Sequence, residues 1–162
     1  MSNIDIDIRL VKNAQELEDM FYQRWLVLRS PLGMERGSER DSHENGACHI
    51  IAATGDRTII GSGRLRELSP ELGSISYIAV LPEFQNQGIG TKLMEKLIAQ
   101  AKENNFTTLR LMSRINAVKF YKNLGFVEKD NPFEYLGIPH IFMELKTAVE
   151  TASIQTKPAS AG

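Results

Sequence analysis

The chain has 162 residues, 42% of them apolar and 24% charged, and its formal net charge is −1. This length suits one domain with a proper core, and the near-neutral charge argues against nucleic acid or a membrane surface as partner. Because the chain has one cysteine, Cys48, and no run near the roughly 18 apolar residues of a membrane-spanning helix, we expect a cytoplasmic protein that acts on small partners.

The first third of the chain is predicted to form a strand, a helix and a polar loop. Apolar residues alternate with charged ones over residues 5–11, the period of a half-buried strand. Asn13 is placed to cap the helix that follows, with Glu16 completing a capping-box pattern, and Ser30-Pro31-Leu32-Gly33 ends this helix. Residues 34–46 are polar and without period, which indicates a mobile loop or a broken short helix.

Three strands in succession are expected next. Residues 49–53 and 58–65 are apolar runs joined by a turn signal, and residues 68–73 form a second turn into a strand over 74–80. An amphipathic helix over 89–104 leads to a strand over 107–112. A strand, helix, strand order of this spacing makes a right-handed crossover, so the last two strands should be parallel neighbours.

The remaining chain is expected to hold a short helix and a closing hairpin. The helix covers residues 116–123, and the hairpin strands, 133–136 and 140–145, flank the turn Gly137-Ile138-Pro139. Residues 147–162 are small, polar and aperiodic, which predicts a flexible tail after a single domain at 1–146. The elements together predict an α/β protein of the α+β kind, with a mixed sheet of about seven strands and about four helices.

The stretch over residues 77–93 carries the strongest functional signal. An apolar strand leads through a proline into a loop with Gly88 and Gly90 and then into a helix, whose first N–H groups are unpaired at its positive end. Such a helix end binds phosphate. The order Thr91-Lys92 does not match a nucleotide P-loop, and Leu93 stands where a dinucleotide fingerprint needs its third glycine.

The pattern that remains is Val80-Leu81-Pro82-Glu83-Phe84-Gln85-Asn86-Gln87-Gly88-Ile89-Gly90-Thr91, which resembles the acetyl-CoA pyrophosphate loop of the GNAT superfamily of N-acetyltransferases. The run from Arg114 to Phe126 resembles the Ala-x-x-Phe-Tyr-x-x-x-Gly-Phe signature of the same superfamily, and the element order resembles its acyl-CoA acyltransferase fold over residues 5–145. The resemblance implies an acetyltransferase that moves an acetyl group from acetyl-CoA to a primary amine of a small molecule or peptide by direct transfer. It also allows a homodimer.

The resemblance further implies which residues contact acetyl-CoA. The loop would hold the pyrophosphate, and the strand before it would pair with the pantetheine arm and supply an oxyanion donor from the N–H of Ala79 or Val80. Arg114 stands where many relatives carry Asn, and it is expected to reach a phosphate or an anionic acceptor. The expected cofactor-binding residues are Ile78, Ala79, Val80, Gln85, Asn86, Gln87, Gly88, Ile89, Gly90, Thr91, Arg114 and Asn116.

Tyr121 is the expected general acid for the departing thiolate. A phenol with an ordinary pKa of about 10 is protonated at neutral pH, and the resemblance places this tyrosine beside the CoA sulfur. The general base stays open, because the strand over 74–80 has no carboxylate where some relatives carry Glu. Glu67, Glu134 and His140 are the candidates.

Other kinds of site are weaker interpretations. No metal is expected, because the spacing of His43 and His49 with the neighbouring acids matches no metal site. Cys48 has no identifiable base partner, which argues against a nucleophilic role. A catalytically weak acyl-CoA-binding sensor, or an enzyme with a different acyl donor, would also carry these signatures, and the acceptor amine is not encoded in any pattern we can read.

Overall fold

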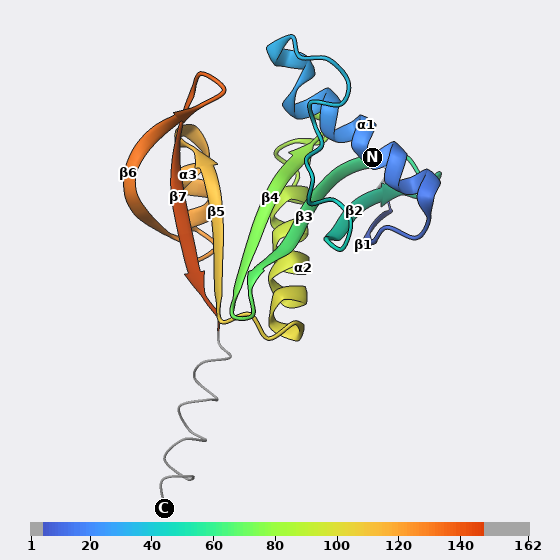
Figure 1. Cartoon of the computed structure of the whole chain (residues 1–162). Helices are drawn as coiled ribbons and strands as arrows, with labels where there is room; N and C mark the ends of the chain where they lie inside the picture. Colours follow the sequence, from blue (N-terminus) through green and yellow to red (C-terminus); the bar gives the residue numbers. More distant parts are fainter. Residues whose placement is uncertain (1–4, 148–162) are drawn as a thin grey trace, which may run out of the picture. The chain divides into compact units, whose positions relative to one another are not determined.

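The computed structural model describes residues 5–147 of the chain (Figure 1). Seven strands form one sheet of order β1-β2-β3-β4-β5-β7-β6. The strands are β1 Ile6–Leu10, β2 Cys48–Thr54, β3 Ile59–Ser69, β4 Leu72–Val80, β5 Thr108–Arg114, β6 Val127–Tyr135 and β7 Ile138–Lys146. The α-helices of this part of the chain are α1 Ala14–Leu28, α2 Ile89–Glu103 and α3 Val118–Lys122, with short 3₁₀ turns η1 Ser30–Leu32, η2 Pro82–Phe84 and η3 Ile115–Ala117. The predicted mixed α/β architecture is confirmed, with three α-helices within residues 5–147 where about four were expected.

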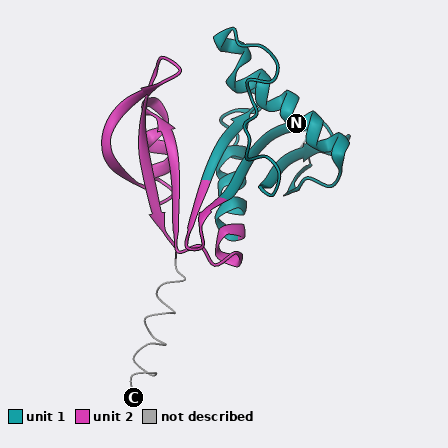
Figure 2. Ribbon diagram, viewed as in Figure 1, with its two compact units in different colours: residues 1–66, 75–99 teal, residues 67–74, 100–162 magenta. Residues whose placement is uncertain are grey.

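The elements fall into two compact units, which Figure 2 colours separately. Unit 1 holds the chain up to residue 66 together with residues 75–99, and unit 2 holds residues 67–74 and those from 100 on. Unit 1 therefore contains β1, β2, α1, most of β3 and α2, and the second half of β4. Unit 2 contains β5, β6, β7, α3 and the β3–β4 turn.

Helix α1 begins and ends at the residues that the sequence marks. The Glu16 N–H donates to the Asn13 side chain over 2.8 Å, as a capping box requires. The Glu16 carboxylate returns to the N–H of Lys12, also over 2.8 Å, rather than to that of Asn13. The helix ends at Leu28, directly before the predicted terminating segment Ser30–Gly33, of which Ser30–Leu32 forms η1. Gly33 ends η1 with a left-handed backbone, φ of 73°, which a glycine adopts without a Cβ clash.

Helices α1 and α2 cover opposite faces of the sheet in unit 1. Gln23 of α1 accepts a hydrogen bond of 2.6 Å from the Ser62 hydroxyl of β3. On the other face, a Cβ added to Gly63 would lie 2.8 Å from Leu97 of α2 and 2.7 Å from Ile78. The glycine thus allows α2 to approach β3 closely. Leu97 is fully buried, which is worth about 2 kcal/mol relative to an exposed leucine.

The strand pairs of unit 2 follow the predicted crossover. Strands β4 and β5 are parallel, with Leu72, Gly73 and Ser74 opposite Thr108, Leu109 and Arg110. The turn between β3 and β4 is shorter than expected, because β3 continues to Ser69 and β4 begins at Leu72. Pro70 suits the first central position of such a tight turn, since its ring fixes φ.

Strands β6 and β7 form the expected closing hairpin with a tighter turn than predicted. Leu136 and Gly137 both have positive φ, 54° and 73°, which is the geometry of a two-residue type I′ turn. Pro139 lies inside β7, opposite Glu134, and not in the turn. Strand β6 is interrupted by a register shift between Lys129 and Phe133.

The last described residue is part of the fold. Thr147 is buried, its hydroxyl donates to the Phe106 carbonyl over 2.9 Å, and its N–H donates to the Thr107 carbonyl over 3.1 Å. The remainder of the predicted tail, residues 148–162, lies outside the described residues. None of the helices within residues 5–147 is long and apolar enough to cross a membrane.

Candidate active site

The loop between β4 and α2 is shaped by two left-handed residues. Asn86 has φ of 63° and Gly88 has φ of 84°. A Cβ built on Gly88 would meet no protein atom within 4 Å, so the space beside this backbone is open. Gly90 lies in the first turn of α2. Of the two predicted loop glycines, Gly88 therefore has the conformation that requires glycine.

The N-terminus of α2 presents unpaired backbone donors. The hydrogen bond from the Lys92 N–H to the Gly88 carbonyl, 3.1 Å long, closes the first turn of the helix. Within residues 5–147, the N–H groups of Ile89, Gly90 and Thr91 have no partner. These donors and the positive end of the helix dipole together make a site for an anion such as phosphate.

Side chains of the loop brace its backbone. The Gln85 amide donates to the Val80 carbonyl over 3.0 Å, and the Gln87 amide donates to the Glu83 carbonyl over 3.3 Å. Both amide groups were predicted to bind the cofactor. One N–H of each amide is used within the loop, which leaves the second N–H and the carbonyl oxygen of each side chain for a ligand.

The second half of β4 carries an unusual backbone. Tyr77 has φ of 58°, in the middle of the strand, where a non-glycine residue rarely adopts positive φ. The parallel pairing of β4 ends at Ser74, before this residue. The Ala79 carbonyl accepts a hydrogen bond of 3.0 Å from Gln23 of α1. The predicted cofactor-binding residues 78–80 thus lie between the strained Tyr77 and the anion-binding loop, all within unit 1.

A buried charge network lies beside Tyr77. Arg24 of α1 has no exposed side-chain surface and donates to the Glu44 carboxylate over 2.9 Å. Arg64 of β3 makes a bidentate pair with Asp41, at 2.7 and 3.0 Å, and lies 3.2 Å from Glu44. These four residues join α1, β3 and the polar segment after η1.

The network contacts the ring of Tyr77. The guanidinium carbons of Arg24 and Arg64 lie 4.1 and 4.8 Å from the ring centroid, and that of Arg29 lies 5.7 Å away. The Tyr77 hydroxyl donates to Asp41 over 3.3 Å. Cations over an aromatic face are attracted by its quadrupole, so these contacts fix the ring position.

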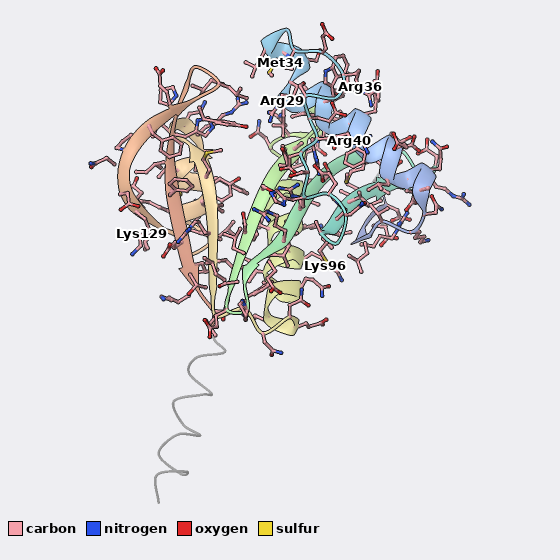
Figure 3. All side chains as sticks on the ribbon, viewed as in Figure 1. Arg29, Met34, Arg36, Arg40, Lys96 and Lys129 are labelled. Carbon is pink, nitrogen blue, oxygen red and sulfur yellow. The ribbon has the colours of Figure 1, made fainter. Side chains whose placement is uncertain are left out.

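The segment over residues 34–46 is consequently held in place and does not form the mobile loop that its polarity indicated. Its Glu39 is 1% exposed, and the Glu39 carbonyl accepts from Arg24 over 3.0 Å. The Met34 carbonyl accepts from the Trp25 indole over 2.9 Å. Figure 3 shows Met34 near the C-terminal end of α1.

The contacts and the burial of this network perturb the ionisation of its titratable groups. The Arg64 guanidinium beside Asp41 holds the pKa of that carboxyl well below its usual range. Burial lowers the pKa of His49, whose ring Nε2 lies 3.0 Å from the Glu44 carbonyl oxygen. Burial also raises the pKa of the Tyr77 phenol. At neutral pH we therefore expect ionised Asp41, neutral His49 and neutral Tyr77.

Sequence reasoning missed this network, although α1 held a signal. Arg24 falls within the apolar stripe of α1, three residues after Phe21 and four after Met20, both fully buried. A charged residue on the buried face of a helix requires a partner of opposite charge. The acidic residues of the segment 34–46 supply that partner.

In unit 2, Tyr121 of α3 is enclosed by aromatic rings. The residue is 9% exposed and makes edge-to-face contacts with Phe120 at 5.0 Å and Phe126 at 6.0 Å between ring centroids. Its hydroxyl has no hydrogen-bond partner within residues 5–147. Burial raises its pKa to about 12, so the phenol stays protonated at neutral pH.

Two further predicted cofactor-binding residues follow β5. Arg114 ends the strand and is half-buried, and its guanidinium makes no ion pair with the part of the chain that the structure describes. Asn116 lies in η3 and is exposed. Both side chains are therefore available to a ligand.

The three candidate bases differ in their surroundings. Glu67, near the end of β3, and Glu134, in β6, are exposed. His140 of β7 is 6% exposed, and its Nδ1 lies 2.7 Å from the Ile138 carbonyl oxygen. A carbonyl oxygen can only accept, so Nδ1 carries the proton and Nε2 keeps its lone pair in the neutral ring. Phe133 stacks on this imidazole at 6.2 Å.

The surroundings of Cys48 do not activate its thiol. Burial raises the pKa of the Cys48 thiol, which lowers its thiolate fraction and its reactivity. Within residues 5–147, no group of three or more His, Cys, Asp or Glu side chains is arranged to hold a metal ion.

The fold and the anion-binding loop define a protein of the acyl-CoA N-acyltransferase class. A family model described as "Acetyltransferase (GNAT) domain" matches residues 33–147, and the chain belongs to this GNAT family. An uncharacterized N-acetyltransferase of Bacillus subtilis, YjcF, is 31% identical over 135 residues, which cover 83% of this chain and 95% of the relative.

Solved structures share the fold at lower sequence identity. An acyl-CoA N-acyltransferase from Pseudomonas aeruginosa superposes with a TM-score of 0.75 at 20% identity, covering 88% of this chain and 99% of the other. A GNAT family acetyltransferase from Elizabethkingia anophelis, solved with acetyl-CoA bound, has a TM-score of 0.66 at 20% identity, covering 88% and 98%. The GNAT resemblance drawn from the two sequence signatures is thus confirmed.

Proposed function

We propose that the protein is an acetyl-CoA-dependent N-acetyltransferase that acts on a primary amine of a small molecule or peptide, in the reducing cytoplasm that its single cysteine suits. The observation that carries this proposal is the set of unpaired N–H groups at residues 89–91, beside the open left-handed Gly88. Such donors suit the pyrophosphate of acetyl-CoA. The Elizabethkingia anophelis protein, whose structure contains acetyl-CoA, supports the choice of ligand.

In the proposed reaction the amine nitrogen attacks the thioester carbonyl carbon, the C–S bond breaks, and CoA leaves as a thiolate. The carbonyl oxygen gains negative charge on the way. The backbone N–H of Ala79 or Val80 stabilises that charge, a task that needs a fixed dipole rather than a particular side chain. The direct transfer requires amine and thioester to be bound together.

Tyr121 is proposed as the general acid that protonates the leaving sulfur. Its pKa of about 12 lies above the roughly 8.5 of an ordinary thiol, so complete transfer to a free thiolate costs about 5 kcal/mol. This cost is well below the total barrier of about 16 kcal/mol of an enzyme that turns over ten times per second. A hydrogen bond from the phenol to the sulfur as the C–S bond breaks is therefore the main expected contribution.

His140 is the base that the side-chain geometry favours over Glu67 and Glu134. Its Nδ1 is fixed by the Ile138 carbonyl, which leaves Nε2 to accept a proton from the attacking amine. The two glutamates are exposed, and within residues 5–147 neither makes a hydrogen bond or ion pair through its carboxylate that would orient it.

Calorimetric titration with acetyl-CoA, followed by an amine-panel assay for released thiol, tests the proposal. We expect binding of acetyl-CoA, and much weaker binding of S-acetylpantetheine, which lacks the pyrophosphate. Turnover of any amine on the panel would support the enzyme. Binding of acetyl-CoA without turnover on a broad panel would favour the acyl-CoA sensor, and equal binding of the two thioesters would contradict the assigned role of residues 89–91.

A further inference from the structure

Tyr77 combines two costly features at one position. A left-handed backbone at a non-glycine residue is unfavourable, by about 1–2 kcal/mol, and Tyr77 holds it with φ of 58° inside β4. Strained residues persist only where their surroundings impose the conformation, and they cluster at functional sites. The strain therefore indicates that something holds Tyr77 in this conformation.

The charges around Tyr77 are also costly. Within residues 5–147, the Arg24 side chain is fully buried and its Nε and Nη2 have no hydrogen-bond partner, and Glu44 Oε1 is buried without one as well. Buried ion pairs are often replaceable by apolar side chains without loss of stability. The network beside Tyr77 is thus poorly explained as a source of stability alone.

We propose that Arg24, Asp41 and Arg64 act as positioning residues that hold the Tyr77 ring and, through it, the left-handed turn of β4. The guanidinium carbons of Arg24 and Arg64 lie 4.1 and 4.8 Å from the ring centroid, and the Tyr77 hydroxyl donates a hydrogen bond to Asp41. The ring is attached to the strained backbone itself, so fixing the ring restricts the rotation of φ.

The turn at Tyr77 sets the direction of the next residues. Ala79 and Val80, whose N–H groups are the proposed oxyanion donors, follow two and three residues later, and a change in φ at Tyr77 would redirect both. A donor misplaced by about 1 Å can cost about 100-fold in rate. The inference rests on the proposed function, because it concerns the geometry of the same reacting site.

Replacing Tyr77 by Ala and by Gly separates this role from ordinary packing. Both variants lose the ring, but only glycine adopts positive φ without a Cβ penalty. The assay uses acetyl-CoA and the amine that gives the fastest thiol release. We expect kcat of Tyr77→Ala to be about tenfold or more below wild type, and kcat of Tyr77→Gly to be at least about threefold higher than that of Tyr77→Ala. Loss of packing alone predicts that glycine is no better than alanine, and that result would overturn the inference.

Asp41→Asn provides a second, gentler test. Its carboxylate is 35% exposed and Arg64 keeps Glu44 as a partner, so the change leaves no isolated buried charge. We expect kcat to fall severalfold in the wild-type background and the effect to vanish in Tyr77→Gly, because residues acting through one another are non-additive. Equal effects in both backgrounds would refute a role through Tyr77.

Glu16→Gln is the matched control. Glu16 pairs with Arg9 at 2.6 Å in the same unit and contacts neither β4 nor the network. We expect Glu16→Gln to lower the free energy of unfolding and to leave kcat unchanged. If kcat falls as much as in Asp41→Asn, weakening any ion pair of unit 1 slows turnover, and the effect of Asp41→Asn does not support the positioning role. Acetyl-CoA affinity is measured on every variant. Failure of the wild-type protein to bind acetyl-CoA would refute the proposed function. If the wild-type protein binds and turns over normally but Tyr77→Ala and Tyr77→Gly have equal kcat, only the positioning role is refuted.

Discussion

Removal of a single oxygen atom tests the proposed leaving-group chemistry. In Tyr121→Phe the aromatic ring stays between Phe120 and Phe126, whose edge-to-face contacts do not involve the hydroxyl. The hydroxyl has no hydrogen-bond partner within residues 5–147, so its loss leaves no orphaned donor or acceptor there. We expect the free energy of unfolding at pH 7 to change by less than about 1 kcal/mol.

The expected loss of turnover depends on how far the proton moves. A general acid contributes about 100-fold or more, whereas a neutral hydrogen bond to sulfur is worth about tenfold. The pKa of about 12 favours the smaller figure at neutral pH, because complete transfer to sulfur is uphill. We therefore expect kcat to fall between tenfold and about 100-fold, with the dissociation constant of acetyl-CoA unchanged.

Single-turnover thiol release with saturating acetyl-CoA and amine measures this step directly. A rate within about twofold of wild type, a smaller loss than the tenfold value of one hydrogen bond, would refute the role of Tyr121.

The same variant should also change the stability of the protein at alkaline pH. Since the folded pKa is about 12 and the unfolded pKa about 10, the protein loses stability as the pH rises from 10 to 12. Tyr121→Phe should reduce this loss in denaturant titrations, and the part that remains is expected from Tyr77, whose pKa burial also raises.

Three further changes probe other parts of the molecule. Gly88→Ala should weaken acetyl-CoA binding about tenfold in calorimetry. Gly37, with φ of 105° and equally open space beside it, provides the control. Gly88→Ala and Gly37→Ala should each lower the free energy of unfolding by about 1 kcal/mol, but Gly37→Ala should leave the affinity for acetyl-CoA unchanged. If both variants bind alike, Gly88 is only a turn residue. His140→Gln should lower kcat/KM about 100-fold, whereas Glu134→Gln should leave it unchanged. The reverse result would assign the role of base to Glu134. Burial lowers the pKa of His49, so the unfolded chain takes up this proton first as the pH falls below about 6.5. Denaturant titrations of wild type should show stability decreasing there, and His49→Gln should flatten the decrease.

The parts of the fold that follow from local rules were predicted from the sequence. Asn13 and Glu16 mark the start of α1 because capping depends on residues within one turn of each other. The parallel pairing of β4 and β5 follows from the crossover between them. The turn at Leu136 was misplaced because Pro139 looked like a turn residue, although a proline also fits within a strand at a position that needs no N–H.

The network around Tyr77 could not be predicted in the same way. Its contacts join Arg24, Asp41 and Arg64, which lie 17 to 40 residues apart in the chain, so no local pattern connects them. The strain at Tyr77 is likewise invisible in the sequence, because tyrosine is a good strand former with no preference for positive φ. The pKa of Tyr121 depends on how deeply its ring is enclosed, which composition does not reveal.

The interruption of β6 affects how the protein behaves at high concentration. As the last strand in the sheet order, β6 presents a row of backbone groups along which another chain could add itself. Pro132 has no N–H to offer, Asp130 turns the backbone with φ of 64°, and the register breaks between Lys129 and Phe133. Growth of the sheet from the β6 edge would have to begin at this broken row, so the exposed apolar side chains Val127 and Tyr135 lie on an edge that disfavours the addition of another chain.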